Sequence, residues 1–168
     1  MVNTKKIVLL ALFVAMASVL HVVESWIPLP LPVPGIKLGL ANIVSLVAIY
    51  LYGWHEAIYI AILRVLLGSL FGGTLLGPAF FMSMSGAIVS TSAMAFVQYY
   101  WQPPFSIIGV SVIGSVVHSF AQIMIAALLV TSSSLLWYLP YLIVFAVAAG
   151  VLTGLTTNYF LAKVPRFC

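Results

Sequence analysis

Long apolar stretches, separated by short breaks that carry glycine, proline or charge, dominate the sequence. Breaks at 24–37, 53–56, 71–78, 101–104 and 131–138 leave six apolar segments, at 7–23, 38–52, 57–70, 79–100, 105–130 and 139–162. A straight helix needs about 20 residues to cross a bilayer core, so the second and third segments are too short unless they borrow neighbouring residues or form half-length, re-entrant elements. The pattern predicts an all-α membrane protein, a six-segment transmembrane helical bundle with short second and third segments, forming a single integral membrane domain over residues 1–168.

Composition agrees with a location in the bilayer. Hydrophobic residues make up 64% of the chain and charged residues 5%, and the mean hydropathy is +1.27. A soluble domain carries roughly 25% charged residues. The six basic residues are scattered and form no stripe, which argues against a nucleic-acid partner. The single cysteine, Cys168, leaves no cysteine-rich metal site, and we expect neither a metal nor a cofactor.

The basic residues indicate topology instead. Lys5 and Lys6 precede the first apolar segment, whereas Lys163 and Arg166 follow the last. The positive-inside rule therefore places both termini in the cytoplasm, as an integral protein of the cell membrane. An even number of crossings agrees with six segments. We interpret the first segment as a retained helix, because no convincing small-x-small cleavage site follows it.

Arg64 is the first candidate for function, because it lies inside the apolar segment 57–70. A guanidinium in a membrane span costs about 2.5 to over 10 kcal/mol, so an internal partner or an anionic ligand is expected. Alternatively, Arg64 snorkels to an interface or donates to the carbonyls of a broken helix. The only carboxylates are Glu24 and Glu56. Lys37 and Arg64 could together bind an anionic group, but a pairing of Glu24 with either cation would weaken that hypothesis. Glu56 is interpreted as a favourable charge at a helix N-terminus.

Other polar side chains interrupt the second and fifth segments. Asn42 could orient a ligand or hold neighbouring helices together. In the fifth segment, Ser111, Ser115, His118 and Gln122 recur at steps of three and four, which predicts one helical face lining the bundle interior. His118 and Gln122 could bind one ligand, or could bond the second segment and Arg64. Too few further histidines and carboxylates exist for a metal site. The candidate ligand-binding residues are Lys37, Asn42, Arg64, His118 and Gln122.

Two further features concern access and partners. Residues 26–35 carry prolines at 28, 30, 32 and 34, which favours extended polyproline II backbone. This stretch could cover the mouth of a pocket as a lid or serve as a rigid connector. In the first segment, Ala11 and Ala15 lie four residues apart, and such small residues let helices approach closely. That face could dock a partner subunit or pack within the chain's own bundle.

Three runs resemble a known family: Gly35-Ile-Lys-Leu-Gly-Leu-Ala-Asn42, Leu63-Arg-Val-Leu-Leu-Gly-Ser69 and Gly114-Ser-Val-Val-His-Ser-Phe-Ala-Gln122. They look like the Gx transporter family, whose members are often labelled heptaprenyl diphosphate synthase component I. That family is similar to the S-components of energy-coupling factor transporters, six-helix proteins that capture vitamins or other micronutrients from outside. The resemblance implies that an Ala-x-x-x-Ala face of the first helix contacts a transmembrane coupling subunit joined to two cytoplasmic ATPases. Ala11 and Ala15 match that pattern.

The residues available argue against catalysis by the chain alone. Prenyl chain elongation needs Mg²⁺ held by clustered carboxylates, but this chain has no aspartate and two separated glutamates. A phosphate-binding loop for ATP is also absent from the sequence, so ATP-driven transport would need partner ATPases. We expect a membrane solute-binding subunit, not an enzyme, for uptake of a small micronutrient or vitamin-like solute. The alternatives are a non-catalytic membrane component of a heptaprenyl diphosphate synthase and a plain structural scaffold.

Overall fold

The computed structural model describes residues 4–26, 37, 39–101 and 105–163. Within this part the chain is helical and contains no β-strand, as the sequence predicts. The helices are α1 (Thr4–Trp26), α2 (Asn42–Tyr52), α3 (Trp54–Phe71), α4 (Pro78–Tyr100), α5 (Ile107–Val130) and α6 (Leu139–Lys163), and a 3₁₀-helix, η1 (Ser133–Tyr138), precedes α6.

Local sequence signals account for several helix ends. Gly53 joins α2 to α3 with a φ of +99°, a backbone conformation that glycine adopts without a steric penalty. Pro78 opens α4, where its missing N–H would have had no helical partner in any case. The side chain of Ser106 accepts a hydrogen bond from the backbone N–H of Gly109 at 3.2 Å and so caps α5.

Five of the helical stretches are long and apolar enough to cross a membrane, and α2 is not one of them. With 11 residues, α2 is about 16 Å long, which confirms the short second segment. The prediction of a short third segment is wrong, because α3 has 18 residues rather than covering only 57–70. Gly53 makes the turn alone, so Trp54, His55 and Glu56 become the first turn of α3. The described helices thus provide five stretches that could cross the membrane, and α2 is too short to be a sixth.

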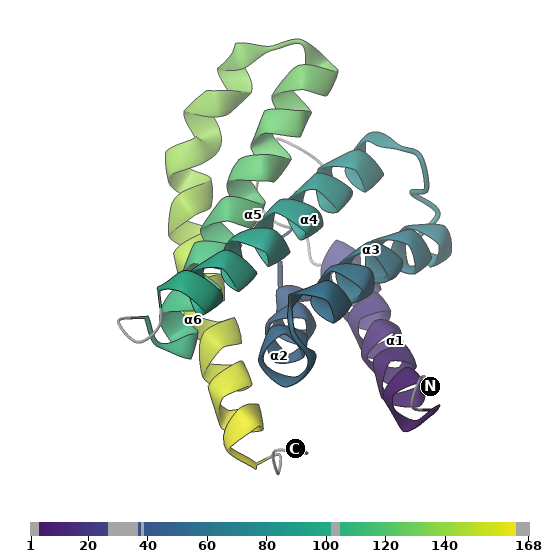
Figure 1. Cartoon of the computed structure of the whole chain (residues 1–168). Helices are drawn as coiled ribbons and strands as arrows, with labels where there is room; N and C mark the ends of the chain where they lie inside the picture. Colours follow the sequence, from purple (N-terminus) through teal and green to yellow (C-terminus); the bar gives the residue numbers. More distant parts are fainter. Residues whose placement is uncertain (1–3, 27–36, 38, 102–104, 164–168) are drawn as a thin grey trace.

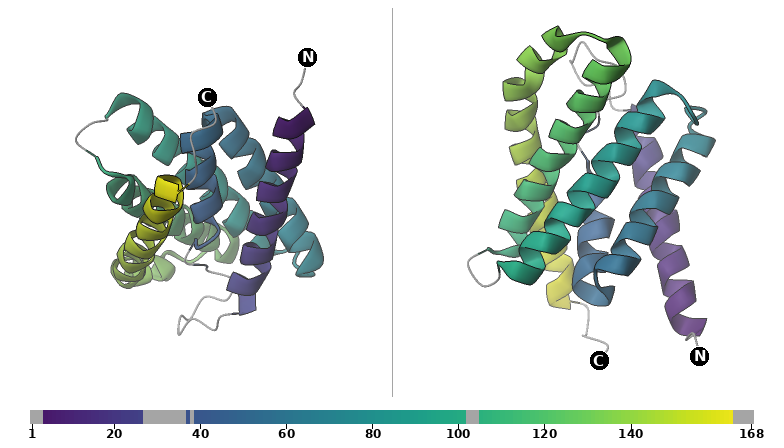
Figure 2. Two further views of the ribbon diagram at one scale, coloured as in Figure 1. Left: turned by 90° about the horizontal axis from the view of Figure 1, so that it is seen from below. Right: turned by 45° about the horizontal axis from the view of Figure 1, so that its top comes forward.

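The helices surround α2, which contacts α1, α3, α4, α5 and α6 (Figure 1). Helix α5 packs between α4 and α6, and α1 packs against α3. The Thr4 end of α1 and the Lys163 end of α6 lie at the same side of the bundle, at the bottom of Figure 1 and of the right-hand view in Figure 2. On that side Lys6 forms an ion pair with Glu56, which joins the start of α1 to the first turn of α3.

Helices α5 and α6 approach each other at two glycines of α6. A Cβ atom on Gly150 would lie 2.6 Å from the Cα of Val112, and one on Gly154 would lie 2.7 Å from the Cα of Ile108. Between them, the hydroxyls of Ser111 and Thr153 are hydrogen bonded at 2.6 Å. Small residues and interhelical hydroxyl bonds of this kind stabilise helix pairs in membranes.

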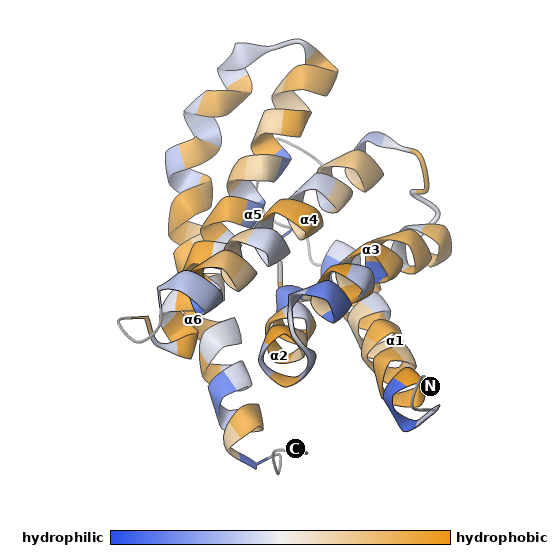
Figure 3. Ribbon diagram, in the orientation of Figure 1, coloured by the Kyte–Doolittle hydropathy of each residue, from blue (hydrophilic) through white to orange (hydrophobic). Residues whose placement is uncertain are grey.

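Large hydrophobic side chains are exposed on α1, α3, α4, α5 and α6, and apolar residues recur along these helices in Figure 3. Large hydrophobic side chains such as Leu12, Leu128 and Val144 are more than half exposed. In water such a surface would be strongly unfavourable, whereas lipid tails solvate it well. Together with the long apolar helices, this surface identifies a membrane protein.

Candidate functional site

Eight buried polar side chains meet in the interior of the bundle. They are His21, Glu24, Lys37, Asn42, Arg64, Ser90, His118 and Gln122, and none is more than 7% exposed. Five helices and the segment that precedes α2 supply them. We call this group the polar cluster. All five residues that the sequence suggested as ligand-binding belong to it, whereas His21, Glu24 and Ser90 were not among those candidates.

Arg64 lies near the middle of α3 and finds its partner on α2. Its Nη2 donates a hydrogen bond to Oδ1 of Asn42 at 2.8 Å. The side chain of Arg64 is 1% exposed, so it does not snorkel to an interface. This contact fixes the orientation of the Asn42 amide, because the oxygen must face the guanidinium and Nδ2 must then point elsewhere.

Lys37 is turned inward and bonds α1. Its Nζ lies 2.8 Å from Nε2 of His21 and donates to the backbone carbonyl of His21 at 3.2 Å. An ammonium group can only donate, so His21 accepts at Nε2 and is neutral. Burial and, to a lesser extent, the positive charge of Arg64 lower the pKa of Lys37 to about 8, although the negative charge of Glu24 opposes the shift. Lys37 therefore still carries its proton at neutral pH.

Gln122 joins α5 to the same segment. Its Oε1 accepts a hydrogen bond from the backbone N–H of Lys37 at 3.2 Å. As with Asn42, this contact fixes the amide orientation, because the oxygen must face the N–H of Lys37 and Nε2 must then point elsewhere. The interior face predicted for α5 is confirmed, because Ser111, Ser115, His118 and Gln122 are all buried.

Glu24 holds the segment before α2 against the end of α1. One carboxylate oxygen accepts the backbone N–H groups of both Gly39 and Leu40, the latter at 3.1 Å. Arg64 and Lys37 attract this carboxylate electrostatically. Among the residues described, however, Glu24 forms no ion pair with nitrogen and oxygen within 4 Å of each other, whereas Glu56 forms one with Lys6. Sequence reasoning raised Glu24 only as a possible partner for the cations and missed its bonds to the backbone.

His118 lies at the centre of the cluster between two glycines. Its Nδ1 is 3.5 Å from Oγ of Ser90. A Cβ on Gly39 would lie 2.9 Å from Nδ2 of Asn42 and 3.3 Å from Cδ2 of His118. A Cβ on Gly86 would lie 2.8 Å from Cε1 of the same ring and 3.1 Å from Cγ of Gln122. Gly39 and Gly86 therefore lie at different edges of the imidazole, and neither position leaves room for a side chain.

Three nitrogen donors of the polar cluster are buried and have no hydrogen-bond partner among the residues that the structure describes: Nδ2 of Asn42, Nε of Arg64 and Nε2 of Gln122. The other unpartnered buried side-chain atoms in the described part of the chain are hydroxyls, which can donate or accept. A buried donor without a partner costs about 1–3 kcal/mol. In the described part of the cluster, every unpartnered nitrogen is thus a donor.

The remaining sequence candidates fall at the edge of the described region or outside it. Ala11 and Ala15 are exposed on α1, so the bundle itself does not use that face. Ala15 also lines an apolar groove of about 490 Å³ between α1 and α3, together with Val19, Leu67 and Phe71. Residues 27–36, the candidate lid or connector, are not described by the structure.

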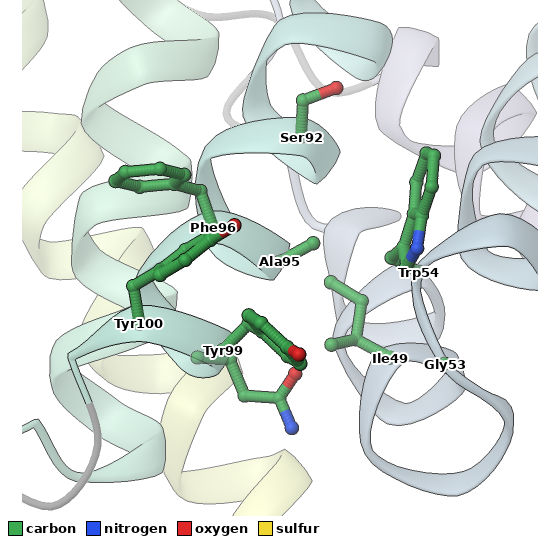
Figure 4. Close-up of a pocket in the computed structure, with 9 residues that line it drawn as sticks. Ile49, Gly53, Trp54, Ser92, Ala95, Phe96, Tyr99 and Tyr100 are labelled. Carbon is green, nitrogen blue, oxygen red and sulfur yellow. The ribbon is translucent and has the colours of Figure 1, made fainter.

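A second pocket lies away from the polar cluster, at the side where α1 begins and α6 ends (Figure 4). Its volume is about 650 Å³. The lining is mainly apolar and aromatic and comes from the turn between α2 and α3 and the last turns of α4; it consists of Ile49, Gly53, Trp54, Ser92, Ala95, Phe96, Gln98, Tyr99 and Tyr100. The lining contains neither Arg64 nor Lys37, so this pocket and the polar cluster are separate.

Within the described residues, His, Cys, Asp and Glu side chains form no group of three that could hold a metal ion.

Comparison with curated proteins and with solved structures gave no match. The family model described as heptaprenyl diphosphate synthase component I matches residues 13–160, which include every residue of the polar cluster. The chain therefore belongs to the heptaprenyl diphosphate synthase component I family.

Proposed function

We propose that the protein is a membrane solute-binding subunit, similar to an energy-coupling factor S-component, for uptake of a small micronutrient or vitamin-like solute. The observation that carries this proposal is the polar cluster, with three unpartnered donors inside an apolar bundle. Membrane proteins seldom bury ionisable residues without a functional reason. Small-molecule sites usually combine apolar walls with a few convergent polar groups of this kind.

In this proposal the solute enters from the outer side and binds among Lys37, Asn42, Arg64, His118 and Gln122. Both termini then lie in the cytoplasm, which the positions of Lys5, Lys6 and Lys163 support. The cluster is closed to solvent in the structure, so entry requires movement, and the segment that Glu24 holds is the connection nearest to the cluster. The chain supplies binding but no catalysis.

Release would depend on partner subunits, a transmembrane coupling subunit and cytoplasmic ATPases. The exposed face of α1 around Ala11 and Ala15 supports a docking role, since it presents small side chains that no other helix of the bundle covers. Ala15→Trp should reduce co-purification of such partners and leave the thermal midpoint of the isolated chain unchanged. Val144→Trp, at a position 69% exposed on α6, is the matched control. Equal partner recovery with both variants would argue against docking at Ala15.

The proposed function is tested by native mass spectrometry of the detergent-purified protein, followed by identification of released small molecules. We expect a water-soluble solute on the wild type and none on a folded Arg64→Ala variant. Arg64→Lys, which keeps the charge but not the planar fork of donors, should retain only part of the solute. Full retention of solute by folded Arg64→Ala would remove Arg64 from the site.

The second candidate function is a non-catalytic membrane component of a heptaprenyl diphosphate synthase that holds an isoprenoid. The aromatic pocket of about 650 Å³, at the side of the bundle where α1 begins and α6 ends, supports it. The description of the family supports it as well. Among the described residues, the lining of this pocket carries no cation to pair with a diphosphate. A polyprenyl diphosphate recovered in the same mass spectrometry experiment would favour this candidate over solute uptake.

A further inference from the structure

The charges of the polar cluster do not balance. Arg64 is always protonated and Lys37 is protonated at neutral pH, whereas Glu24 is the one carboxylate that lies among the described residues of the cluster. His21 adds no charge, because it accepts a hydrogen bond from the ammonium group of Lys37. With Glu24 ionised and the ring of His118 neutral, the cluster carries a net charge of about +1 inside an apolar bundle.

The hydrogen bonds of the cluster leave N–H donors unpartnered, in the same direction as the excess of positive charge. The carboxylate of Glu24 already accepts two backbone N–H groups, Oδ1 of Asn42 accepts from Arg64, and Oε1 of Gln122 accepts from Lys37. The three donors that remain are all N–H groups, and the orientations of both amides are fixed by their partners. A neutral ligand that only donates hydrogen bonds could therefore satisfy none of them.

From this excess of positive charge and N–H donors we infer that the solute is a monoanion, a carboxylate that accepts hydrogen bonds from Arg64 and Asn42 and carries a second acceptor group for Gln122. This inference rests on the proposed function. The carboxylate would meet Nε of Arg64 and Nδ2 of Asn42, which the hydrogen bond between these two side chains holds near each other. A carbonyl or similar oxygen would meet Nε2 of Gln122.

The charge also selects against phosphorylated solutes. A phosphate monoester carries about −1.5 to −2 at neutral pH, which exceeds what the cluster compensates. A diphosphate carries still more negative charge and would leave part of it unpaired in the bundle. A carboxylate matches both the single net charge and the planar arrangement of donors on a guanidinium.

The experiment places a carboxylate in the cluster by substitution. Asn42→Asp keeps an oxygen for Arg64 and replaces the unpartnered Nδ2 by a negatively charged acceptor. In protein stripped of solute, we expect an upward shift of the thermal midpoint and a loss of solute capture. Gln98→Glu, the same amide-to-carboxylate change in the half-buried wall of the other pocket, is the matched control and should not raise the midpoint. A midpoint lowered by Asn42→Asp would overturn the inference.

Gln122→Glu provides a second variant if Asn42→Asp does not fold. It should also raise the thermal midpoint of solute-free protein, whereas a decrease would count against an anion site. The solute released from the wild type gives an independent result. A carboxylate supports the inference; a neutral, cationic or phosphorylated solute overturns it and leaves the uptake function standing. Recovery of no solute, or of a polyprenyl diphosphate, would instead remove the proposed function itself.

Discussion

Arg64 on α3 donates from Nη2 to Oδ1 of Asn42, the first residue of α2, at 2.8 Å. This hydrogen bond connects the most deeply buried cation of the described chain to a helix too short to cross the membrane by itself. Short helices beside irregular backbone are tolerated at membrane depth where other protein groups satisfy their ends. The contact therefore gives α2 a fixed place in the bundle and gives Arg64 a polar environment.

Removing the acceptor should be costly. Asn42→Ala leaves a buried guanidinium with one hydrogen bond fewer, and we expect the free energy of unfolding to fall by about 1.5–3 kcal/mol. Unfolding of the detergent-solubilised protein by titration with denaturing detergent measures this loss. In a double-mutant cycle with Arg64→Met, the coupling energy should be about 0.5–3 kcal/mol. Additive effects of the two substitutions would mean that the contact contributes little.

The bonds from Glu24 to the segment before α2 can be tested by hydrogen exchange. Glu24→Ala removes the acceptor of the backbone N–H groups of Gly39 and Leu40, so both amides should exchange faster. Glu24→Gln keeps an acceptor oxygen and should preserve part of the protection. Mass spectrometry of peptides covering residues 39–41 reads the difference. Unchanged protection in Glu24→Ala would show that the carboxylate does not hold this segment.

Lys37 gives a pH dependence whose sign follows from its environment. Burial lowers its pKa from the ordinary value of 10.5 to about 8, beside His21 and Glu24 on α1 and Arg64 on α3. Between these two pKa values the unfolded chain binds the proton and the folded chain does not, so stability rises with pH.

Lys37→Met removes that dependence. The thermal midpoint of the wild type should therefore increase relative to that of Lys37→Met as pH is raised from about 8 to 10, where the two pKa values of Lys37 lie. Thermal unfolding of both proteins in the same detergent, at half-unit pH steps, measures the difference. Parallel midpoints across this range would mean that the ammonium group of Lys37 is not destabilised by folding.

Gly150 and Gly114 both lie close to a neighbouring helix, but Gly150 faces backbone and Gly114 faces a side chain. A Cβ on Gly150 meets the backbone of Val112, whereas one on Gly114 meets the flexible side chain of Met94. Gly150→Ala must separate α5 from α6 and should lower the free energy of unfolding by about 1–3 kcal/mol. Gly114→Ala should cost less, because Met94 can adopt another rotamer. Thermal unfolding compares the two, and a larger loss for Gly114→Ala would contradict this account of the α5–α6 contact.

Much of the fold follows from local sequence. The apolar runs and their glycine and proline breaks place the helices within a few residues, because helix formation in a membrane depends on the length of an apolar run and on signals at its ends. The face of α5 that carries His118 and Gln122 follows from spacing alone. The sequence pattern places the start of the third helix too late, because the polar residues at its start resemble a break, yet Gly53 alone makes the turn.

The partners of the buried polar groups depend on tertiary structure. Lys37 could equally have faced the outer surface, but the structure directs it to His21 on α1 and to Gln122, which lies 85 residues later in the chain. Glu24 could have paired with a cation, but it binds two backbone N–H groups instead. Composition and the lengths of the apolar runs determined by themselves that this chain is a helical membrane protein, since residue type sets the affinity for lipid and run length favours helices that cross it. Which polar atoms meet is decided only when the helices pack, because a hydrogen bond requires two groups within about 3 Å and in the right orientation.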